Sequence, residues 1–353
     1  MHDFSRIKKL SNTLASGEGF YISDFSDLFY FSGFSGTYAR IIAGGETPLF
    51  ITDSRYKGVV DKLNLTSAFK VIITKDFKAE LPALISSFSK ILLTSHTPLL
   101  EYIAFQKIGK VLALSDSVST LRMIKDQQEI ETLRRSVAIT EAGISHVFGL
   151  LKEGVSEIAL SSEFEAFIKQ KGAQSTSFSS IVAFGENSAV PHHQPSSRKL
   201  KTGDLVLLDC GAKLDGYCSD LTRMAAFGII KSSLNAFMVD YNIVSEAKKL
   251  ACALYLPGTP LKDADLAARE FFKSYNIEGL FTHSLGHGLG LDVHEKPNSR
   301  LGETGVFKPG FVLSCEPGIY REGVYGIRIE DDYLVTENGP EKIGHMSDTL
   351  TIL

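Results

Sequence analysis

The sequence predicts two domains, an α/β domain at the amino end and a larger α+β domain after it. At 353 residues the chain is long for one hydrophobic core, so two domains are expected. Strand-like runs alternate with helical stretches in the first third, a pattern that indicates an α/β sheet. We expect these strands at 39–43, 50–52, 71–74 and 91–94, and the domains at 1–121 and 122–353.

The second domain interleaves helical and strand patterns, which fits an α+β layer arrangement. Its first helical segment carries an apolar stripe that includes Ile130, Leu133 and Val137, and Gly154 follows as a stop signal. A turn rich in Pro and Gly precedes the last helix of this domain. We expect helices at 127–151, 157–171, 235–253 and 262–275.

A β-hairpin is predicted between residues 205 and 223. Its first strand begins with an apolar run, and Asp215-Gly216 is a dipeptide that tolerates positive φ at both central positions of a two-residue turn. Pairing about this turn sets Leu214 opposite Tyr217. That register determines which polar side chains of the hairpin share a face.

Two aspartates fall on one face of this hairpin. Asp209 lies opposite Thr222, and Asp220 is the diagonal neighbour of Asp209, with Cα atoms about 7 to 8 Å apart. That separation suits two carboxylates that hold a metal ion between them, and Gly211, opposite Asp220, leaves space for the ion. The alternative is a surface hairpin with solvated aspartates, which the apolar run before Asp209 disfavours.

Three histidines, His283, His287 and His294, lie within twelve positions, whereas the whole chain has nine. Their spacing alone is compatible with one face of a helix. The glycines between Gly286 and Gly290 argue against a helix, because each costs about 1 kcal/mol relative to alanine. We therefore expect a loop and strand edge where backbone approaches a ligand closely.

Two glutamates complete the set of candidate ligands. Glu316 ends an apolar strand just before a Pro-Gly pair, where functional side chains are often presented. Glu330 shares a strand face with Arg328, so we expect this arginine to orient or balance the carboxylate. The alternative for that pair is an ordinary cross-strand salt bridge.

Four carboxylates in one place would repel each other and be pushed toward protonation unless cations compensated them. Two divalent cations would cancel that charge. One imidazole and four carboxylates form a hard, oxygen-rich donor set, which favours Mn. Structural zinc sites are instead rich in thiolates. Co, Fe and Zn remain alternatives, because metal availability often decides.

Together these segments resemble the catalytic domain of the pita-bread metallopeptidases, the family of methionine aminopeptidase, aminopeptidase P, prolidase and creatinase. The ligand types arrive in the family's order, and Asp209 and Asp220 are eleven positions apart, as in the family. The resemblance implies two metal ions bridged by Asp220 and Glu330. Asp209 would complete one ion, and His287 with Glu316 would complete the other.

The resemblance also implies roles in a hydrolytic reaction. A hydroxide shared by the two metals would attack the scissile carbonyl, and Glu316 would act as both ligand and proton shuttle. By the same resemblance, His283 and His294 lie near the substrate and His192 lies at the pocket wall. Arg328 and Tyr320 match positions behind the ligands.

The amino-terminal segments 27–37 and 48–56 look like the creatinase-type domain of aminopeptidase P and prolidase. The resemblance then implies an exopeptidase for small peptides with proline in second position. We expect an Xaa-Pro aminopeptidase, and the alternative is an Xaa-Pro dipeptidase, or prolidase. Some prolidases carry an arginine shortly after the segment that ends at Pro297, where this chain has Asn298 and then Arg300. A non-catalytic pita-bread protein and a creatinase-like hydrolase are further alternatives.

Composition and charge bear on whether the protein binds nucleic acid, crosses a membrane or is secreted. A net charge of −4 with no basic run gives no reason to expect nucleic-acid binding. We also expect no membrane span and no signal segment, because no apolar run reaches about 18 residues and the amino end is polar. With four cysteines interpreted as reduced, the prediction is a cytoplasmic protein. The resemblance implies a homodimer.

Overall fold

The computed structural model describes residues 3–228 and 234–353. The chain forms two compact units, Met1–Arg122 and Met123–Leu353. Among the described residues, no helix carries an apolar stretch long enough to cross a bilayer.

The first unit is built on one six-stranded sheet with the order β4-β3-β2-β1-β5-β6. The predicted strands β2, β3, β4 and β5 are confirmed, whereas β1 and β6 were not predicted. Strand β1 contains Gly19, and a Cβ there would lie 2.9 Å from the ring of Phe88. The strands are β1 (Glu18–Ile22), β2 (Ala39–Ala43), β3 (Leu49–Thr52), β4 (Lys70–Ile73), β5 (Lys90–Leu93) and β6 (Val111–Leu114). The helices are α1 (Ser5–Ser11), α2 (Phe25–Ser32), α3 (Lys57–Lys62), α4 (Phe77–Leu84), α5 (Leu99–Lys107) and α6 (Ser117–Met123).

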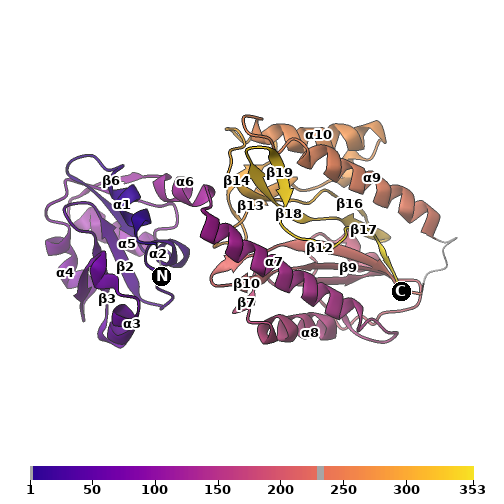
Figure 1. Cartoon of the computed structure of the whole chain (residues 1–353), viewed down its shortest axis with the longest axis horizontal. Helices are drawn as coiled ribbons and strands as arrows, with labels where there is room; N and C mark the ends of the chain where they lie inside the picture. The colour runs from indigo at the N-terminus through magenta and orange to yellow at the C-terminus, as the bar shows by residue number, and fades with distance from the viewer. Residues whose placement is uncertain (1–2, 229–233) are drawn as a thin grey trace. The chain divides into compact units, whose positions relative to one another are not determined.

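The second unit contains the four predicted helices. They are α7 (Gln127–Phe148), α8 (Glu157–Gln170), α9 (Asn235–Cys252) and α10 (Leu261–Ser274). Helix α7 begins at a capping box in which Asp126 and Glu129 each accept a backbone N–H of the first turn. Figure 1 shows α7 and α8 beside strands β7 to β12, and α9 and α10 side by side near β13 to β17.

The strands of the second unit form several small sheets. A four-stranded sheet has the order β20-β12-β9-β8, and a five-stranded sheet has the order β14-β13-β15-β18-β19. A three-stranded sheet, β11-β10-β7, and the hairpin β16-β17 complete the set. The strands are β7 (Ser175–Thr176), β8 (Ile181–Phe184), β9 (Leu205–Cys210), β10 (Ala212–Leu214), β11 (Tyr217–Cys218), β12 (Leu221–Ala226), β13 (Gly286–Gly288), β14 (Glu295–Ser299), β15 (Val312–Cys315), β16 (Gly318–Arg321), β17 (Tyr325–Arg328), β18 (Asp331–Thr336), β19 (Gly339–Lys342) and β20 (Thr351–Ile352).

The predicted hairpin and its register are confirmed. Leu214 pairs with Tyr217 across the turn, and Asp209 pairs with Thr222 further along. Asp215 and the following glycine both adopt positive φ, at 48° and 87°. One detail was wrong: Gly211 leaves no room for an ion, because a Cβ there would lie 1.9 Å from the carbonyl oxygen of Ser219.

Candidate metal centre

Strand pairing brings the five predicted ligands together. Strand β12 pairs with β9 on one side, and its Thr222 also forms an isolated bridge with Glu330. Strand β13, which carries His287, pairs with β15, and Glu316 directly follows β15. Each ligand therefore lies within or immediately beside a strand, where the backbone is fixed by its ladder of hydrogen bonds.

The distances define a compact cluster. One ligand atom from each of Asp220, His287 and Glu330 lies within 4.8 Å of the others. The Nε2 atom of His287 is 3.7 Å from Asp220 Oδ2 and 3.3 Å from Glu316 Oε1. Asp209 lines the same pocket as these four residues. All five predicted ligands therefore face a single space.

The burial of this cluster fits a cationic ligand. Asp220 and Glu330 are only 5% and 1% exposed. Burial and the neighbouring carboxylates raise the pKa of Asp220 and of Glu330 well above the usual range. The Oδ1 atoms of Asp209 and Asp220 have no hydrogen-bond partner among the described residues. A divalent cation would relieve both the repulsion and the missing contacts, so the donor set fits a metal centre.

His287 is oriented for coordination through Nε2. Its Nδ1 lies 3.2 Å from the carbonyl oxygen of Gly288, and donation of Nδ1–H to this carbonyl leaves a lone pair on Nε2. Burial opposes the charged imidazole, but the Glu316 carboxylate outweighs burial and raises the pKa of His287. Burial likewise opposes ionisation of Glu316, yet without a metal ion Nε2–H of the protonated imidazole donates to Glu316 instead, and this hydrogen bond lowers the pKa of Glu316 to about 2. This glutamate is therefore held ionised.

Arg328 pairs with Asp209 and not directly with Glu330. We expected Arg328 to orient or balance Glu330, and the structure links the two side chains through a third residue. Arg328 donates through Nε to the Thr222 hydroxyl at 3.1 Å, and the same hydroxyl donates to Glu330 Oε2 at 2.7 Å. A second donor of Arg328 forms the ion pair with Asp209. Because Thr222 bridges them, the arginine steadies both carboxylates.

The predicted site residues other than Tyr320 line one pocket of about 380 Å³. Tyr320 lies behind it, where its hydroxyl accepts from Arg328 at 2.7 Å and lies 2.8 Å from His283 Nε2. His283 Nδ1 is 2.8 Å from the Ser284 carbonyl, so in the tautomer that donates there, Nε2 accepts a hydrogen bond from the Tyr320 hydroxyl. The pocket is lined by Phe178, Ser179, Ile181, Pro191, His192, Gln194, Asp209, Asp220, His283, Ser284, His287, His294, Asn298, Glu316, Arg328 and Glu330.

Burial sets the protonation of the two histidines outside the ligand set. Burial lowers the pKa of His283 and of His294 below the usual range for imidazole, with Glu316 acting in the opposite direction. The ring of His294 lies 4.2 Å from the ring of the predicted ligand His287, centroid to centroid. These imidazoles are therefore suited to hydrogen bonding in their neutral form.

One buried carboxyl near the ligands was not predicted. Asp332 is 1% exposed, and its Oδ2 accepts the backbone N–H of Asp220 at 3.0 Å. This contact fixes the backbone of a ligand from a strand more than a hundred positions away. The only signal in the sequence is that Asp332 is the third acidic residue of a run that begins at Glu330, and such a run is equally typical of solvated charges.

A second acidic cluster lies in the first unit. Asp24, Asp27 and His96 offer ligand atoms within 4.8 Å of one another. Asp24 caps helix α2 by accepting two backbone N–H groups, and Asp27 forms an ion pair with Arg122 at 2.8 Å. His96 is exposed. Because capping and ion pairing account for both aspartates, we do not assign a metal site there.

Glu157 holds the segment that carries His192. Its buried carboxylate accepts hydrogen bonds from Phe184 N, Asn187 Nδ2 and Ser196 N, each at 2.9 Å, and from Ser196 Oγ at 2.6 Å. The ring of His193 lies 2.9 Å from the same carboxylate. One side chain therefore ties together the two ends of the loop that contains His192.

We expect Glu157→Ala to destabilise the protein by about 3 kcal/mol or more, because several buried donors lose their acceptor together. For a domain of this size the midpoint of thermal unfolding should fall by about 6 to 12 °C, as measured by calorimetry. Glu153→Ala, an exposed glutamate in the preceding loop, is the control and should melt like the wild type. A Glu157→Ala protein that melts within about 2 °C of wild type would contradict this role.

Metal affinity should rise with pH. The raised pKa values of Asp220 and Glu330 mean that the metal-free carboxyls retain protons where ordinary carboxyls are ionised, so a cation must displace them. We expect about a tenfold gain in affinity per pH unit for each proton displaced. Calorimetric titration with Mn in buffers of different ionisation heat measures the released protons. A metal affinity that does not change with pH would refute competition between protons and the metal ion for these carboxylates.

Comparisons with known proteins agree with this centre. Residues 131–337 match the model of metallopeptidase family M24, and residues 6–124 match the creatinase/prolidase N-terminal domain. An uncharacterized peptidase of Bacillus subtilis, YqhT, is 34% identical over 99% of this chain and 100% of its own length.

Two solved structures are similar over almost the whole chain. The Xaa-Pro dipeptidase from Bacillus anthracis has a TM-score of 0.91 at 32% identity and covers 99% of both chains. The X-Pro aminopeptidase from Thermotoga maritima has a TM-score of 0.87 at 30% identity, covering 99% of this chain and 100% of its own. Both likenesses confirm the predicted fold class. The chain therefore belongs to metallopeptidase family M24 and is a hydrolase with a creatinase/prolidase N-terminal domain.

Proposed function

We propose that this enzyme is a dinuclear-metal-dependent exopeptidase that hydrolyses Xaa-Pro bonds at the amino end of peptides, an Xaa-Pro aminopeptidase. The observation that carries the proposal is the pocket in which four buried side chains and the part-buried Glu316 converge beside apolar side chains. Solved relatives of this fold are named for action on Xaa-Pro peptides. The predicted substrates are small peptides with proline in second position.

We assign two divalent ions to the pocket. Asp209, with Asp220 and Glu330, would hold one ion, and His287 with Glu316 would complete the other. We propose Mn as the metal, because four carboxylates and one imidazole form a hard donor set, with Co, Zn and Fe as alternatives. When bound, the ions would supply Lewis acidity that polarises the scissile carbonyl and activates water.

The chain's own residues then provide proton transfer and positioning. Cleavage of an Xaa-Pro bond leaves a secondary amine that needs a proton, and Glu316 is the carboxylate we assign to deliver it. The neutral His283 and His294 are assigned to hydrogen bonds with the substrate. The chain of contacts from Arg328 through Tyr320 to His283 would hold that imidazole in one orientation.

A proline ring requires an apolar wall, because the pyrrolidine has no N–H and buries carbon atoms only. Phe178, Ile181 and Pro191 supply such side chains in the pocket. His192, which also lines it, completes the wall in our assignment.

The second candidate is an Xaa-Pro dipeptidase, which is the name of the Bacillus anthracis relative. A putative dipeptidase of Bacillus subtilis is also 38% identical over 69% of this chain and 67% of its own length. A dipeptidase must bind the free carboxylate of its substrate. Arg300 does not line the pocket among the described residues and pairs with Glu303 at 3.1 Å. Asn298 lines the pocket in place of an arginine. We therefore favour the aminopeptidase.

Hydrolysis of Ala-Pro and Ala-Pro-Ala by protein stripped with a chelator, with and without added Mn, tests the proposal. Metal-restored cleavage of the tripeptide supports an aminopeptidase, and cleavage of the dipeptide alone supports the dipeptidase. Failure to cleave either peptide with metal bound would overturn the proline specificity.

We also propose a homodimer in the cytoplasm. The family resemblance supports the dimer, and four cysteines that are all free support a reducing compartment. Light scattering of the full chain tests the first: a fully active monomer would contradict it. Cell fractionation tests the second.

A further inference from the structure

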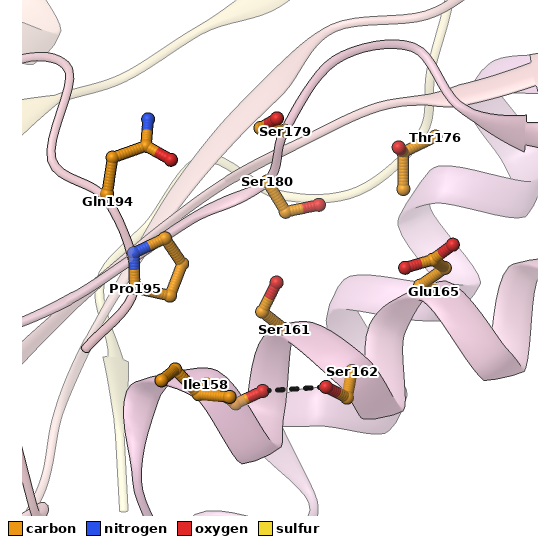
Figure 2. Close-up of a pocket in the computed structure, with 9 residues that line it drawn as sticks. All are labelled: Ile158, Ser161, Ser162, Glu165, Thr176, Ser179, Ser180, Gln194 and Pro195. Carbon is orange, nitrogen blue, oxygen red and sulfur yellow. Dashed lines mark hydrogen bonds between the residues drawn. The ribbon is translucent and has the colours of Figure 1, made fainter. Parts of the chain in front are cut away.

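A second pocket adjoins the catalytic pocket. It has a volume of about 300 Å³, and Figure 2 shows the residues that line it. Two of them, Ser179 and Gln194, also line the catalytic pocket. Because the same two side chains face both pockets, they form the wall between them. The second pocket therefore adjoins the catalytic pocket at these two residues.

Helix α8 forms one side of the second pocket. Ile158, Ser161, Ser162 and Glu165 line it, at the spacing that places residues on one face of a helix. Other residues of the helix, among them Phe164, are buried in the core. Short hydroxyl side chains on the pocket face leave the space that larger residues would fill.

Hydroxyl groups continue around the opposite side, on the segment that ends in β8. Ser180 is 5% exposed, and its Oγ has no hydrogen-bond partner among the described residues. Figure 2 shows Ser161, Thr176, Ser180 and Glu165 pointing toward one space. A buried hydroxyl without a partner is costly, so a ligand with hydrogen-bond donors or acceptors would be favoured here.

Glu165 gives this pocket its charge. It is the one charged side chain among the described residues that line the pocket. Its present partner is Lys169, at 2.7 Å on the next turn, with both side chains about half exposed. Exposed pairs of this kind are weak, so a ligand cation can replace the lysine. The pocket therefore suits an ammonium or guanidinium group surrounded by hydroxyls.

The direction of the substrate determines which residue could arrive there. An exopeptidase that holds the amino terminus of its substrate at the metal centre leaves the peptide free to extend only beyond the scissile bond. We propose that the second pocket is a subsite for the residues after proline, with a preference for a lysine or arginine side chain. This inference rests on the proposed function and deepens it, because such a subsite serves peptides longer than two residues.

Matched peptides test the subsite in the manganese-loaded enzyme. We compare Ala-Pro-Lys-Ala with Ala-Pro-Glu-Ala and Ala-Pro-Ala-Lys with Ala-Pro-Ala-Glu, using Ala-Pro as the substrate that cannot reach the pocket. The lysine peptide of at least one pair should have a kcat/KM about fivefold higher than its glutamate partner. Glu165→Gln should bring that ratio close to one.

Two further variants separate the pocket from general effects of charge and folding. Glu163→Gln removes an equally exposed carboxylate from the same helix, outside the pocket, and should keep the wild-type ratio. Ser161→Phe fills the pocket and should raise KM for the preferred tetrapeptide by about tenfold while Ala-Pro hydrolysis changes by less than about twofold.

Three results would overturn the subsite. Equal rates for lysine and glutamate peptides, or an unchanged ratio in Glu165→Gln, would refute the subsite while the aminopeptidase stands. Cleavage confined to Ala-Pro would refute the subsite and favour the dipeptidase over the aminopeptidase. Failure to cleave any Xaa-Pro peptide would instead refute the proposed function, and the subsite with it.

Discussion

Asp220→Asn should abolish both metal binding and hydrolysis. Asp220 lies at the centre of the cluster, 3.7 Å from His287 Nε2 and within 4.8 Å of a Glu330 oxygen. Asparagine keeps the volume of the side chain but removes the charge and one acceptor oxygen. Loss of a residue that only hydrogen-bonds to a metal ligand costs about 10- to 100-fold in metal affinity. Loss of a ligand that is shared by two ions should therefore cost more than about 100-fold.

The measurement combines metal analysis of the purified variant with kcat/KM on Ala-Pro-Ala. Asp215→Asn is a matched control in the same hairpin, because Asp215 is exposed and its left-handed conformation is one that asparagine tolerates. The control should bind metal and turn over like the wild type. Retention of metal and activity by Asp220→Asn would refute the assignment of this residue as a shared ligand.

Glu316→Gln should lower kcat far more than it lowers metal content. Glu316 lies 3.3 Å from His287 Nε2, and the Ser314 hydroxyl donates to its Oε1 at 3.3 Å. Glutamine retains one oxygen for a metal ion but cannot transfer a proton. A positioned acid or base contributes about 10² to 10⁴ in rate, so we expect a fall in kcat of that size.

Single-turnover kinetics on Ala-Pro-Ala, with metal content measured on the same sample, separate these two effects. Glu322→Gln, an exposed glutamate in the turn between β16 and β17, serves as the control. If kcat of Glu316→Gln stays within about threefold of wild type at full metal occupancy, Glu316 does not carry the proton.

Local pattern was enough to predict most of the fold. The four helices of the second unit have apolar stripes and end signals, and the hairpin has a turn dipeptide that fixes its register. Strand β1 escaped prediction because Gly19 interrupts it, and this glycine is required by the packing of Phe88, which is distant in sequence. Local strand propensity carries no information about such a contact.

The convergence of the candidate ligands on one pocket could be predicted because each occupies a distinctive local setting, such as Asp209 after an apolar run and Glu316 before a Pro-Gly pair. The partner of Arg328 could not be predicted in this way. Spacing along the strand indicated Glu330 as the partner of Arg328. In the structure, Thr222 of strand β12 lies between these two side chains, and the guanidinium forms its ion pair with Asp209. Such contacts depend on residues of another strand, which the local sequence does not reveal.

The roles of Asp332 and Glu157 could not be predicted from the sequence for a related reason. Each carboxylate binds backbone or side-chain donors from segments that are remote in sequence. A single acidic residue on a strand or at a helix start carries no local sign of such a partner. The second pocket is likewise formed by a helix face and two loops that only the tertiary structure brings together.

The central claim is that hydrolysis depends on two metal ions held by Asp209, Asp220, His287, Glu316 and Glu330. We would titrate chelator-stripped protein with Mn and follow bound metal and Ala-Pro-Ala hydrolysis in the same samples. We predict that activity, absent without metal, appears as sites fill and reaches its plateau at two ions per chain. Full activity in the stripped protein, or a protein that binds no Mn, would contradict the claim.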